Sequence, residues 1–157
     1  MPQASAVTSS PAAGLRAVPP RFSCSWKEGG AGAAWVHVTG ELDLATSPKL
    51  RQTLHDAQLS ASLVVLDLRE VTFIESTGVH VILDAAGGVR RGEGRLILVR
   101  GPSHVDHALT LTGASSQVLI LDLDPSEPPA RALLHLAQHE LVVEGSAPLP
   151  ARRAVGE

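Results

Sequence analysis

The sequence predicts an α/β protein, a small mixed and mostly parallel β-sheet that begins with an N-terminal hairpin and has about four helices packed against it. From residue 47 onward, short apolar runs typical of strands alternate with segments whose apolar residues recur at helical spacing. Before residue 47, two segments of period two are separated by a glycine-rich turn. The chain has 157 residues, 44% of them apolar and only 3% aromatic, which favours one domain with an aliphatic core.

The predicted hairpin opens the folded part of the chain. Phe22, Cys24 and Trp26 alternate with polar residues, as in a half-buried strand. Glu28–Gly32 is typical of a turn, and Ala34–Thr39 is rich in the β-branched and aromatic residues that strands prefer. The alternation places Cys24 in the core as a packing residue rather than as a reactive thiol.

Helices and strands are predicted to alternate along the rest of the chain. Ser47 and Pro48 begin a helix as its cap and first residue, with Leu50, Leu54 and Ala57 as its apolar stripe. Leu63–Leu68 is an apolar run of the kind that is buried on both faces of a parallel sheet. The remaining predicted elements are a helix with Ile82, Ala85, Ala86 and Val89, a strand at Leu96–Val99, a short helix after Ser103, a strand at Val118–Leu121 and a final helix starting near Pro128 and Pro129. We expect one domain at residues 21–143 between flexible tails at residues 1–20 and 144–157.

Charge and composition exclude several classes of function. Lys and Arg total 13 and Asp and Glu total 16, a formal net charge of −3, which argues against direct DNA binding through a broad basic surface. One cysteine excludes an intrachain disulfide and a Cys-rich zinc module. The longest apolar stretches fall far short of the roughly 20 residues of a membrane span, and the first 20 residues do not resemble a secretory signal. We therefore expect a cytoplasmic protein without membrane insertion.

Two predicted loops fall on the same edge of the sheet. Gly40–Thr46 follows the second strand and Arg69–Ser76 follows the third. In open α/β sheets, functional loops lie beyond the carboxyl ends of the strands. If these strands are parallel, Asp43 and Ser76 lie on one rim.

Ser76 opens a helix, and the sequence predicts that it is the N-cap. In that position its hydroxyl would accept a hydrogen bond from the amide of Thr77, Gly78 or Val79. A phosphate group would also be favoured there, because the positive end of the helix dipole points at it. A plain cap without chemistry is the simpler explanation of these residues taken alone.

The run from Leu63 to Val99, with its LDL strand and Glu75-Ser76-Thr77-Gly78 turn, follows an upstream GELD segment at Gly40–Asp43. Together these motifs resemble the STAS domain family, which includes sulfate transporter tails and bacterial anti-sigma factor antagonists. The resemblance covers about residues 21–141 and implies a STAS-like small mixed sheet with packed helices.

The resemblance to antagonists of the sporulation type implies a switch. In such proteins a serine of this turn is phosphorylated by a partner kinase that is itself the anti-sigma factor, and the unphosphorylated form binds that kinase and frees a sigma factor. Carried over, Ser76 is the phosphoacceptor, and the phosphorylation loop and partner-binding residues are Glu41, Asp43, Glu75, Thr77, Gly78 and His80. Glu75 stands where the family usually has Asp, and His80 stands at a position that is often small.

The resemblance therefore implies a transcription regulator that is not an enzyme and needs no cofactor. Its implied partner is an anti-sigma factor serine kinase, with a serine phosphatase left open as a second partner. An alternative within the family is a STAS subunit of a lipid ABC transporter or of a larger stress-signalling assembly.

Two other hypotheses come from the residues themselves. Ser76, His80 and Asp84 are spaced like a catalytic triad along one helix face, but the turn lacks the glycine of a nucleophile elbow, and such a ladder is usually a solvated stripe. The histidine pairs His104–His107 and His135–His139 could share a helix face, but neither pair has a third ligand at a recognised spacing, so we expect no metal site.

Overall fold

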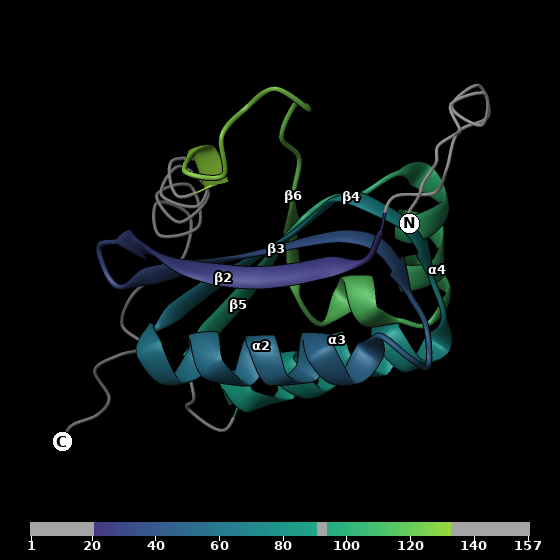
Figure 1. The fold of residues 1–157 in the computed structure, drawn as a ribbon, viewed down its shortest axis with the longest axis horizontal. Helices are drawn as coiled ribbons and strands as arrows, with labels where there is room; N and C mark the ends of the chain where they lie inside the picture. The colour runs from purple at the N-terminus through teal and green to yellow at the C-terminus, as the bar shows by residue number, and fades with distance from the viewer. Residues whose placement is uncertain (1–20, 91–93, 133–157) are drawn as a thin grey trace, which may run out of the picture.

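The computed structural model describes residues 21–90 and 94–132, which form a five-stranded sheet with helices packed on one face (Figure 1). The strands are β2 (Ser23–Gly30), β3 (Ala33–Leu42), β4 (Leu63–Ile74), β5 (Arg95–Val99) and β6 (Leu119–Leu121). The helices are α2 (Ser47–Ser60), α3 (Ser76–Arg90) and α4 (Ser103–Leu111), and a 3₁₀ turn follows at Ala114–Ser116. Both predicted tails, and the final predicted helix beyond Ala132, lie outside the described residues.

The sheet has the predicted mixed topology. Its strand order is β2-β3-β4-β5-β6, with β2 antiparallel to β3 and every later pair parallel. The predicted hairpin and parallel sheet are therefore confirmed. Because β3 and β4 are parallel neighbours, the segments that follow them leave the sheet at the same edge.

The face of the sheet that packs against the helices is aliphatic. Strand residues such as Val36, Val38 and Leu66 are fully buried against Leu50 of α2 and Ile82 of α3. Leucine, isoleucine and valine fill this layer because the sequence offers few aromatic residues, and each buried side chain of this type contributes about 1.5–3 kcal/mol. The resulting core holds the beginnings of α2 and α3 in place at the rim.

Cys24 belongs to the same core. Its side chain is buried, and that burial raises the pKa of its thiol. A raised pKa leaves the thiol protonated and unreactive near neutral pH. The prediction of a packing role is confirmed.

Strands β3 and β4 are longer than the sequence suggested. The predicted loop at Gly40–Thr46 begins as strand, and the predicted loop at Arg69–Ser76 is strand as far as Ile74. The two extensions pair with each other through Glu41–Phe73 and Leu42–Ile74, after irregularities in register near Thr39 and Gly40. Local polarity suggested a loop, whereas pairing with a distant strand satisfies the backbone of these polar residues.

Gly40 marks one of these irregularities. It has a φ of +90°, and a Cβ atom at this position would lie only 2.8 Å from the Cα of Phe22. A side chain would therefore be strained by the backbone conformation and blocked by the backbone just before β2.

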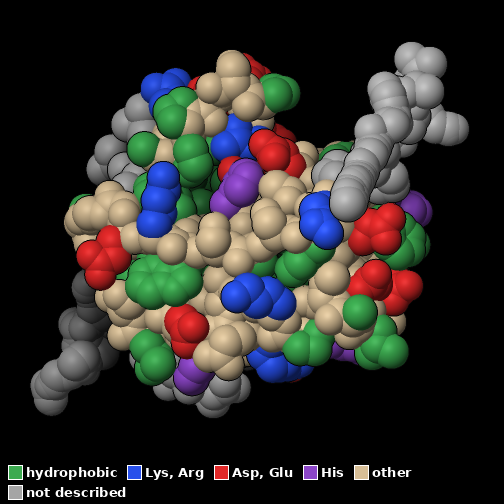
Figure 2. Space-filling model, in the orientation of Figure 1, with side chains coloured by type: hydrophobic (Ala, Val, Ile, Leu, Met, Phe, Trp, Pro, Cys, Tyr) green, Lys and Arg blue, Asp and Glu red, His purple; other side chains and the backbone are tan. Residues whose placement is uncertain are grey.

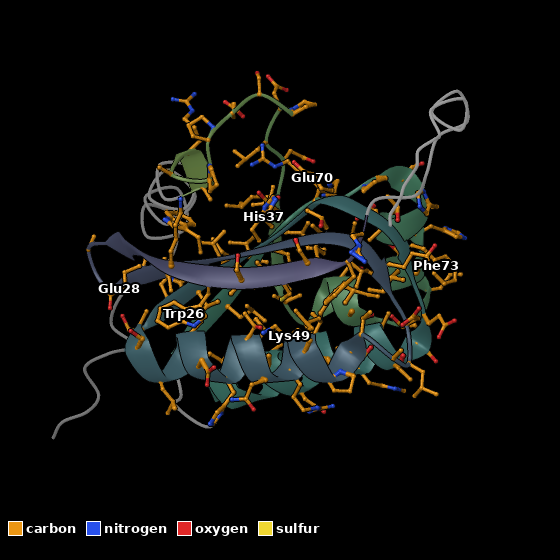
Figure 3. All side chains as sticks on the ribbon, in the orientation of Figure 1. Trp26, Glu28, His37, Lys49, Glu70 and Phe73 are labelled. Carbon is orange, nitrogen blue, oxygen red and sulfur yellow. The ribbon has the colours of Figure 1, made fainter. Side chains whose placement is uncertain are left out.

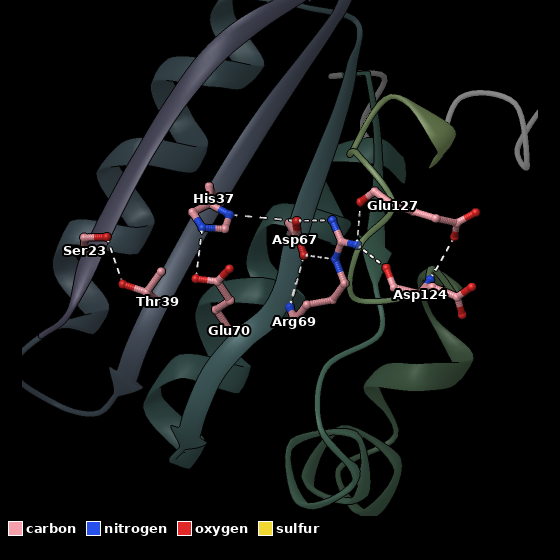
Figure 4. A network of polar contacts seen from close by, with 8 residues as sticks. All are labelled: Ser23, His37, Thr39, Asp67, Arg69, Glu70, Asp124 and Glu127. Atoms are coloured by element: carbon pink, nitrogen blue, oxygen red, sulfur yellow. Dashed lines mark hydrogen bonds and ion pairs between the residues drawn. The ribbon is translucent and has the colours of Figure 1, made fainter. Parts of the chain in front are cut away.

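The opposite face of the sheet carries a buried ion pair (Figure 4). The side chain of Asp67 is 4% exposed, and the Arg69 guanidinium donates two hydrogen bonds to it, from Nε to Oδ1 at 3.0 Å and from Nη2 to Oδ2 at 2.9 Å. Arg69 Nη1 also donates to the carbonyls of Asp124 and Glu127, each at 2.7 Å. Hydrogen bonding to Asp67 raises the pKa of Arg69, so the guanidinium stays charged. Its bonds to the two carbonyls tie the segment after β6 to the sheet.

His37 extends this network on the same face. Its imidazole nitrogens lie 3.8 Å from Asp67 Oδ2 and 3.5 Å from Glu70 Oε1. Figure 3 shows His37 and Glu70 on the side of the sheet away from α2, so the network is separate from the helix-covered face.

We expect Arg69→Met to lower the free energy of unfolding by about 3 kcal/mol, because it leaves the Asp67 carboxylate buried without its cation. The double variant Asp67→Leu/Arg69→Met should recover part of the loss. Urea denaturation followed by circular dichroism measures both effects.

The matched control is Arg51→Met, which removes an exposed ion pair with Asp84 and should cost less than about 1 kcal/mol. Equal destabilisation by the Arg69 and Arg51 variants would contradict the stabilising role of the buried Asp67–Arg69 pair.

Candidate functional site

The candidate site is the edge of the sheet where β3 and β4 end together. The last residue pair between these strands is Leu42–Ile74, and both side chains are buried. The amide of Glu75 then donates to the carbonyl of Leu42 at 2.8 Å. This bond carries the strand pairing one residue further and fixes the point at which α3 can begin.

Asp43 organises the turn between β3 and α2. Its Oδ1 accepts hydrogen bonds from the amides of Ala45 and Thr46, both at 3.0 Å. In return, the Thr46 hydroxyl accepts from the amide of Asp43 at 2.9 Å and donates to the carbonyl of Glu41 at 2.7 Å. Because this carboxylate is occupied within its own turn, it shapes the loop in addition to adding negative charge.

Helix α3 begins at Ser76, one residue earlier than a Ser76 cap requires. The Glu75 carbonyl accepts from the amides of Gly78 at 2.9 Å and Val79 at 3.1 Å, so Glu75 occupies the cap position. The prediction that Ser76 is the N-cap is wrong by one position, because the Leu42 carbonyl fixes the amide of Glu75, whose own carbonyl accepts the first bonds of the helix. Within the described residues, no hydrogen bond uses the Ser76 hydroxyl, which is exposed.

The starts of α2 and α3 are in direct contact. The buried Ser47 hydroxyl donates to the Asp43 carbonyl at 2.6 Å and lies 3.3 Å from the hydroxyl of Thr77. Gly78 allows the close approach of α3, since a Cβ atom there would lie 3.0 Å from Leu42 Cβ and 3.1 Å from Ile74 Cγ1. The two segments therefore form one rigid rim.

The predicted site residues divide by exposure. Glu41, Glu75, Ser76 and His80 are exposed, Asp43 and Thr77 are half-buried, and Gly78 is buried. The structure thus brings the GELD segment and the Ser-Thr-Gly turn together on one rim, with only hydroxyl, carboxylate and imidazole groups of this set reaching solvent. Figure 2 shows acidic side chains at the end of the molecule where β3 and β4 finish.

Two apolar residues of the rim were missed by sequence reasoning. Leu44 is 73% exposed in the turn after β3, and Phe73 is 43% exposed near the end of β4. Figure 3 shows Phe73 at the end of the sheet, away from the Trp26 end of β2. The sequence did contain a signal for both residues, because large apolar side chains are unexpected in segments predicted to be loops. Leu44 also lines a shallow groove with Pro48, Gln52, Thr77 and His80.

Within the described residues, no hydrogen bond links Ser76, His80 and Asp84 as a catalytic triad requires. Asp84 accepts a hydrogen bond from Arg51 Nη1 of α2 at 2.9 Å, which engages the carboxylate that would have to orient His80. Among residues 21–90 and 94–132, no three metal-ligating side chains gather into one cluster. None of the helices in this part of the chain is long and apolar enough to cross a membrane.

The profile of the STAS domain family matches residues 27–127, which includes the whole rim and the sheet from β3 to β6. The chain belongs to the STAS domain family. The resemblance drawn from the GELD segment and the Ser-Thr-Gly turn is thereby confirmed, together with the STAS-like fold.

Two relatives of known name are both anti-sigma-B factor antagonists. Over 90 residues, the chain is 29% identical to the anti-sigma-B factor antagonists of Listeria monocytogenes and Listeria innocua, with 57% of this chain and 79% of each relative covered.

Solved structures share the fold. An anti-sigma factor antagonist from Mycobacterium paratuberculosis aligns with a TM-score of 0.58 at 22% identity, covering 64% of this chain and 86% of that one. The unphosphorylated form of the antagonist SpoIIAA aligns with a TM-score of 0.61 at 16% identity, covering 74% and 97%. The anion transporter Slc26a9 of mouse also contains such a fold, with a TM-score of 0.52 at 16% identity over 60% of this chain and 17% of that one. The fold alone therefore does not separate regulators from transporter domains.

The geometry of the turn predicts that Asp43→Ala lowers the free energy of unfolding by about 1–2 kcal/mol, because the amides of Ala45 and Thr46 lose their acceptor. Asp43→Asn keeps the Oδ1 acceptor and removes only the charge, so it should remain within about 0.5 kcal/mol of the wild type. Thermal and urea denaturation of both variants distinguish the two contributions. If Asp43→Asn were destabilised and Asp43→Ala were not, the hydrogen bonds of Asp43 would not be what holds the turn.

Proposed function

We propose that this STAS domain is an anti-sigma factor antagonist that is switched by phosphorylation. Unphosphorylated, it binds an anti-sigma factor serine kinase in the cytoplasm and frees a sigma factor for transcription. The observation that carries the proposal is the exposed Ser76 hydroxyl, which has no hydrogen-bond partner among the described residues and stands on a rigid rim. The names of the Listeria relatives support the same system.

The covalent step is a phosphoryl transfer from ATP held by the kinase. Ser76 Oγ forms a bond to the γ-phosphorus as the bond from that phosphorus to the β–γ bridging oxygen breaks. ADP leaves, and the serine proton passes to a base of the kinase. This domain supplies the acceptor and its position, and it acts as substrate and binding module rather than as an enzyme. A serine phosphatase would reverse the step by hydrolysis.

The added charge explains how binding would be lost. A phosphoserine carries about −1.5 to −2 charges at pH 7, and it would appear between the exposed carboxylates of Glu41 and Glu75. A partner surface that fits a small neutral hydroxyl would have to accommodate charge, bulk and bound water. The hydroxyl takes no part in the hydrogen bonds of the described residues, so phosphorylation requires no refolding of the rim.

Leu44 and Phe73 give the same surface its apolar contacts. Phenylalanine is enriched at protein interfaces, and an exposed leucine offers apolar area that a partner can bury. In this proposal, contacts of Leu44 and Phe73 supply the binding energy, and the phosphorylation state of Ser76 controls whether the partner binds.

We expect the purified anti-sigma factor serine kinase, supplied with ATP, to add one phosphoryl group to the wild-type chain and none to Ser76→Ala. Thr77→Ala should still be modified, because the acceptor remains. Intact mass and fragment mass spectrometry locate the group. Modification at another residue, or of the Ser76→Ala variant, would refute the assignment.

We expect Leu44→Ala to weaken kinase binding about tenfold or more, which is about 1.4 kcal/mol, without changing the unfolding midpoint. The matched control is Leu59→Ala, which removes an equally exposed leucine at 75% from the opposite end of α2. Isothermal titration calorimetry measures the affinities. Equal losses for both variants would place the interface elsewhere.

A further inference from the structure

His80 lies one helical turn beyond Ser76. Residues four apart on a helix are surface neighbours, with Cβ atoms about 5–6 Å apart. Side chains on a helix also lean toward its N-terminus, so the imidazole of His80 covers the turn that contains Ser76 and Thr77. Both His80 and Ser76 are exposed, and His80 lines the groove beside Thr77. No hydrogen bond or ion pair of the described residues engages the His80 side chain.

The other charged groups around this turn are acidic or already paired. Glu75 precedes Ser76, and Glu41 is the second-last residue of the neighbouring strand β3. On α3 itself, Asp84 follows His80 by one turn and is held by Arg51 of α2 at 2.9 Å. Among the described residues, His80 is therefore the basic side chain one turn from Ser76 that no ion pair occupies.

One further cation of α2 lies close in sequence but points elsewhere. Lys49 lies near the Cys24 thiol, on which its charge acts, and Figure 3 shows it between α2 and the sheet. It is therefore turned away from the groove that holds Thr77 and His80.

We propose that His80 is the phosphate-sensing residue of this switch. When Ser76 is phosphorylated, the imidazolium of His80 pairs with the phosphate along the helix face and favours its doubly charged form. This inference rests on the proposed phosphorylation of Ser76. Histidine side chains change charge between about pH 5 and 8, and a phosphoserine takes its second charge near pH 6, so the pair forms most completely between those two changes.

The pairing would hold the phosphate against α3. A phosphate held there would lie beside the groove that Leu44, Thr77 and His80 line, and its bulk would occupy the surface on which a partner docks.

The test uses the full chain with phosphoserine incorporated at position 76 during translation, so it does not depend on any kinase. A ³¹P NMR titration measures the second pKa of the phosphoserine. We expect that pKa to lie about 0.5 units lower in the wild-type background than in His80→Gln, because an adjacent cation favours the dianion. His80→Arg should restore the lower value, and 1 M salt should reduce the difference.

The matched control is His107→Gln, which removes an exposed histidine from α4 and should titrate like the wild-type background. All variants change exposed side chains, and circular dichroism checks that they fold. Equal phosphoserine pKa values with and without His80, or a shift of the same size in His107→Gln, would overturn the role of His80. Either result leaves the kinase assay on Ser76 unaffected, whereas failure of that assay removes the switch that His80 would serve.

Discussion

The parallel pairing of β3 with β4 is the constraint on which the rest of the site depends. It continues to the Leu42–Ile74 pair and ends in the hydrogen bond from the Glu75 amide to the Leu42 carbonyl. That last bond sets the first residue of α3 and therefore the exposure of the Ser76 hydroxyl. The same pairing brings the turn at Asp43 within contact of Thr77 through Ser47. Two segments thirty residues apart in sequence become one surface because two strands end together.

The sequence predicted those features that depend on local patterns. Alternation at Phe22, Cys24 and Trp26 marked the hairpin, and apolar runs marked the central strands. The extension of β4 to Ile74 could not be predicted, because it depends on pairing with Glu41 and Leu42, which are far away in the chain. The position of the α3 cap was missed for the same reason, since a distant carbonyl holds Glu75. Local chemistry identified which residues form the site, and long-range pairing determined how each one is used.

The two faces of the sheet are stabilised in different ways. Aliphatic packing secures α2, α3 and α4 on one face. The other face combines a smaller apolar cluster, which includes Trp35 and Val65, with the Asp67–Arg69 pair, whose arginine also binds the carbonyls of the segment after β6. A buried pair contributes specificity through directed hydrogen bonds, while an apolar layer tolerates repacking. The rim belongs to the aliphatic side, so its geometry does not depend on the charge network around His37.

A switch that acts by adding charge needs a rigid support and an unoccupied acceptor. Asp43 meets the first need, because its carboxylate is held by the amides of its own turn. Ser76 meets the second, because Glu75 has taken the cap position and left the hydroxyl free of bonds among the described residues. Had Ser76 been the cap, phosphorylation would have removed a bond that holds the helix start. The displacement of the cap by one residue therefore separates the support from the proposed switch, in which charge changes at Ser76 without changing the shape of the rim.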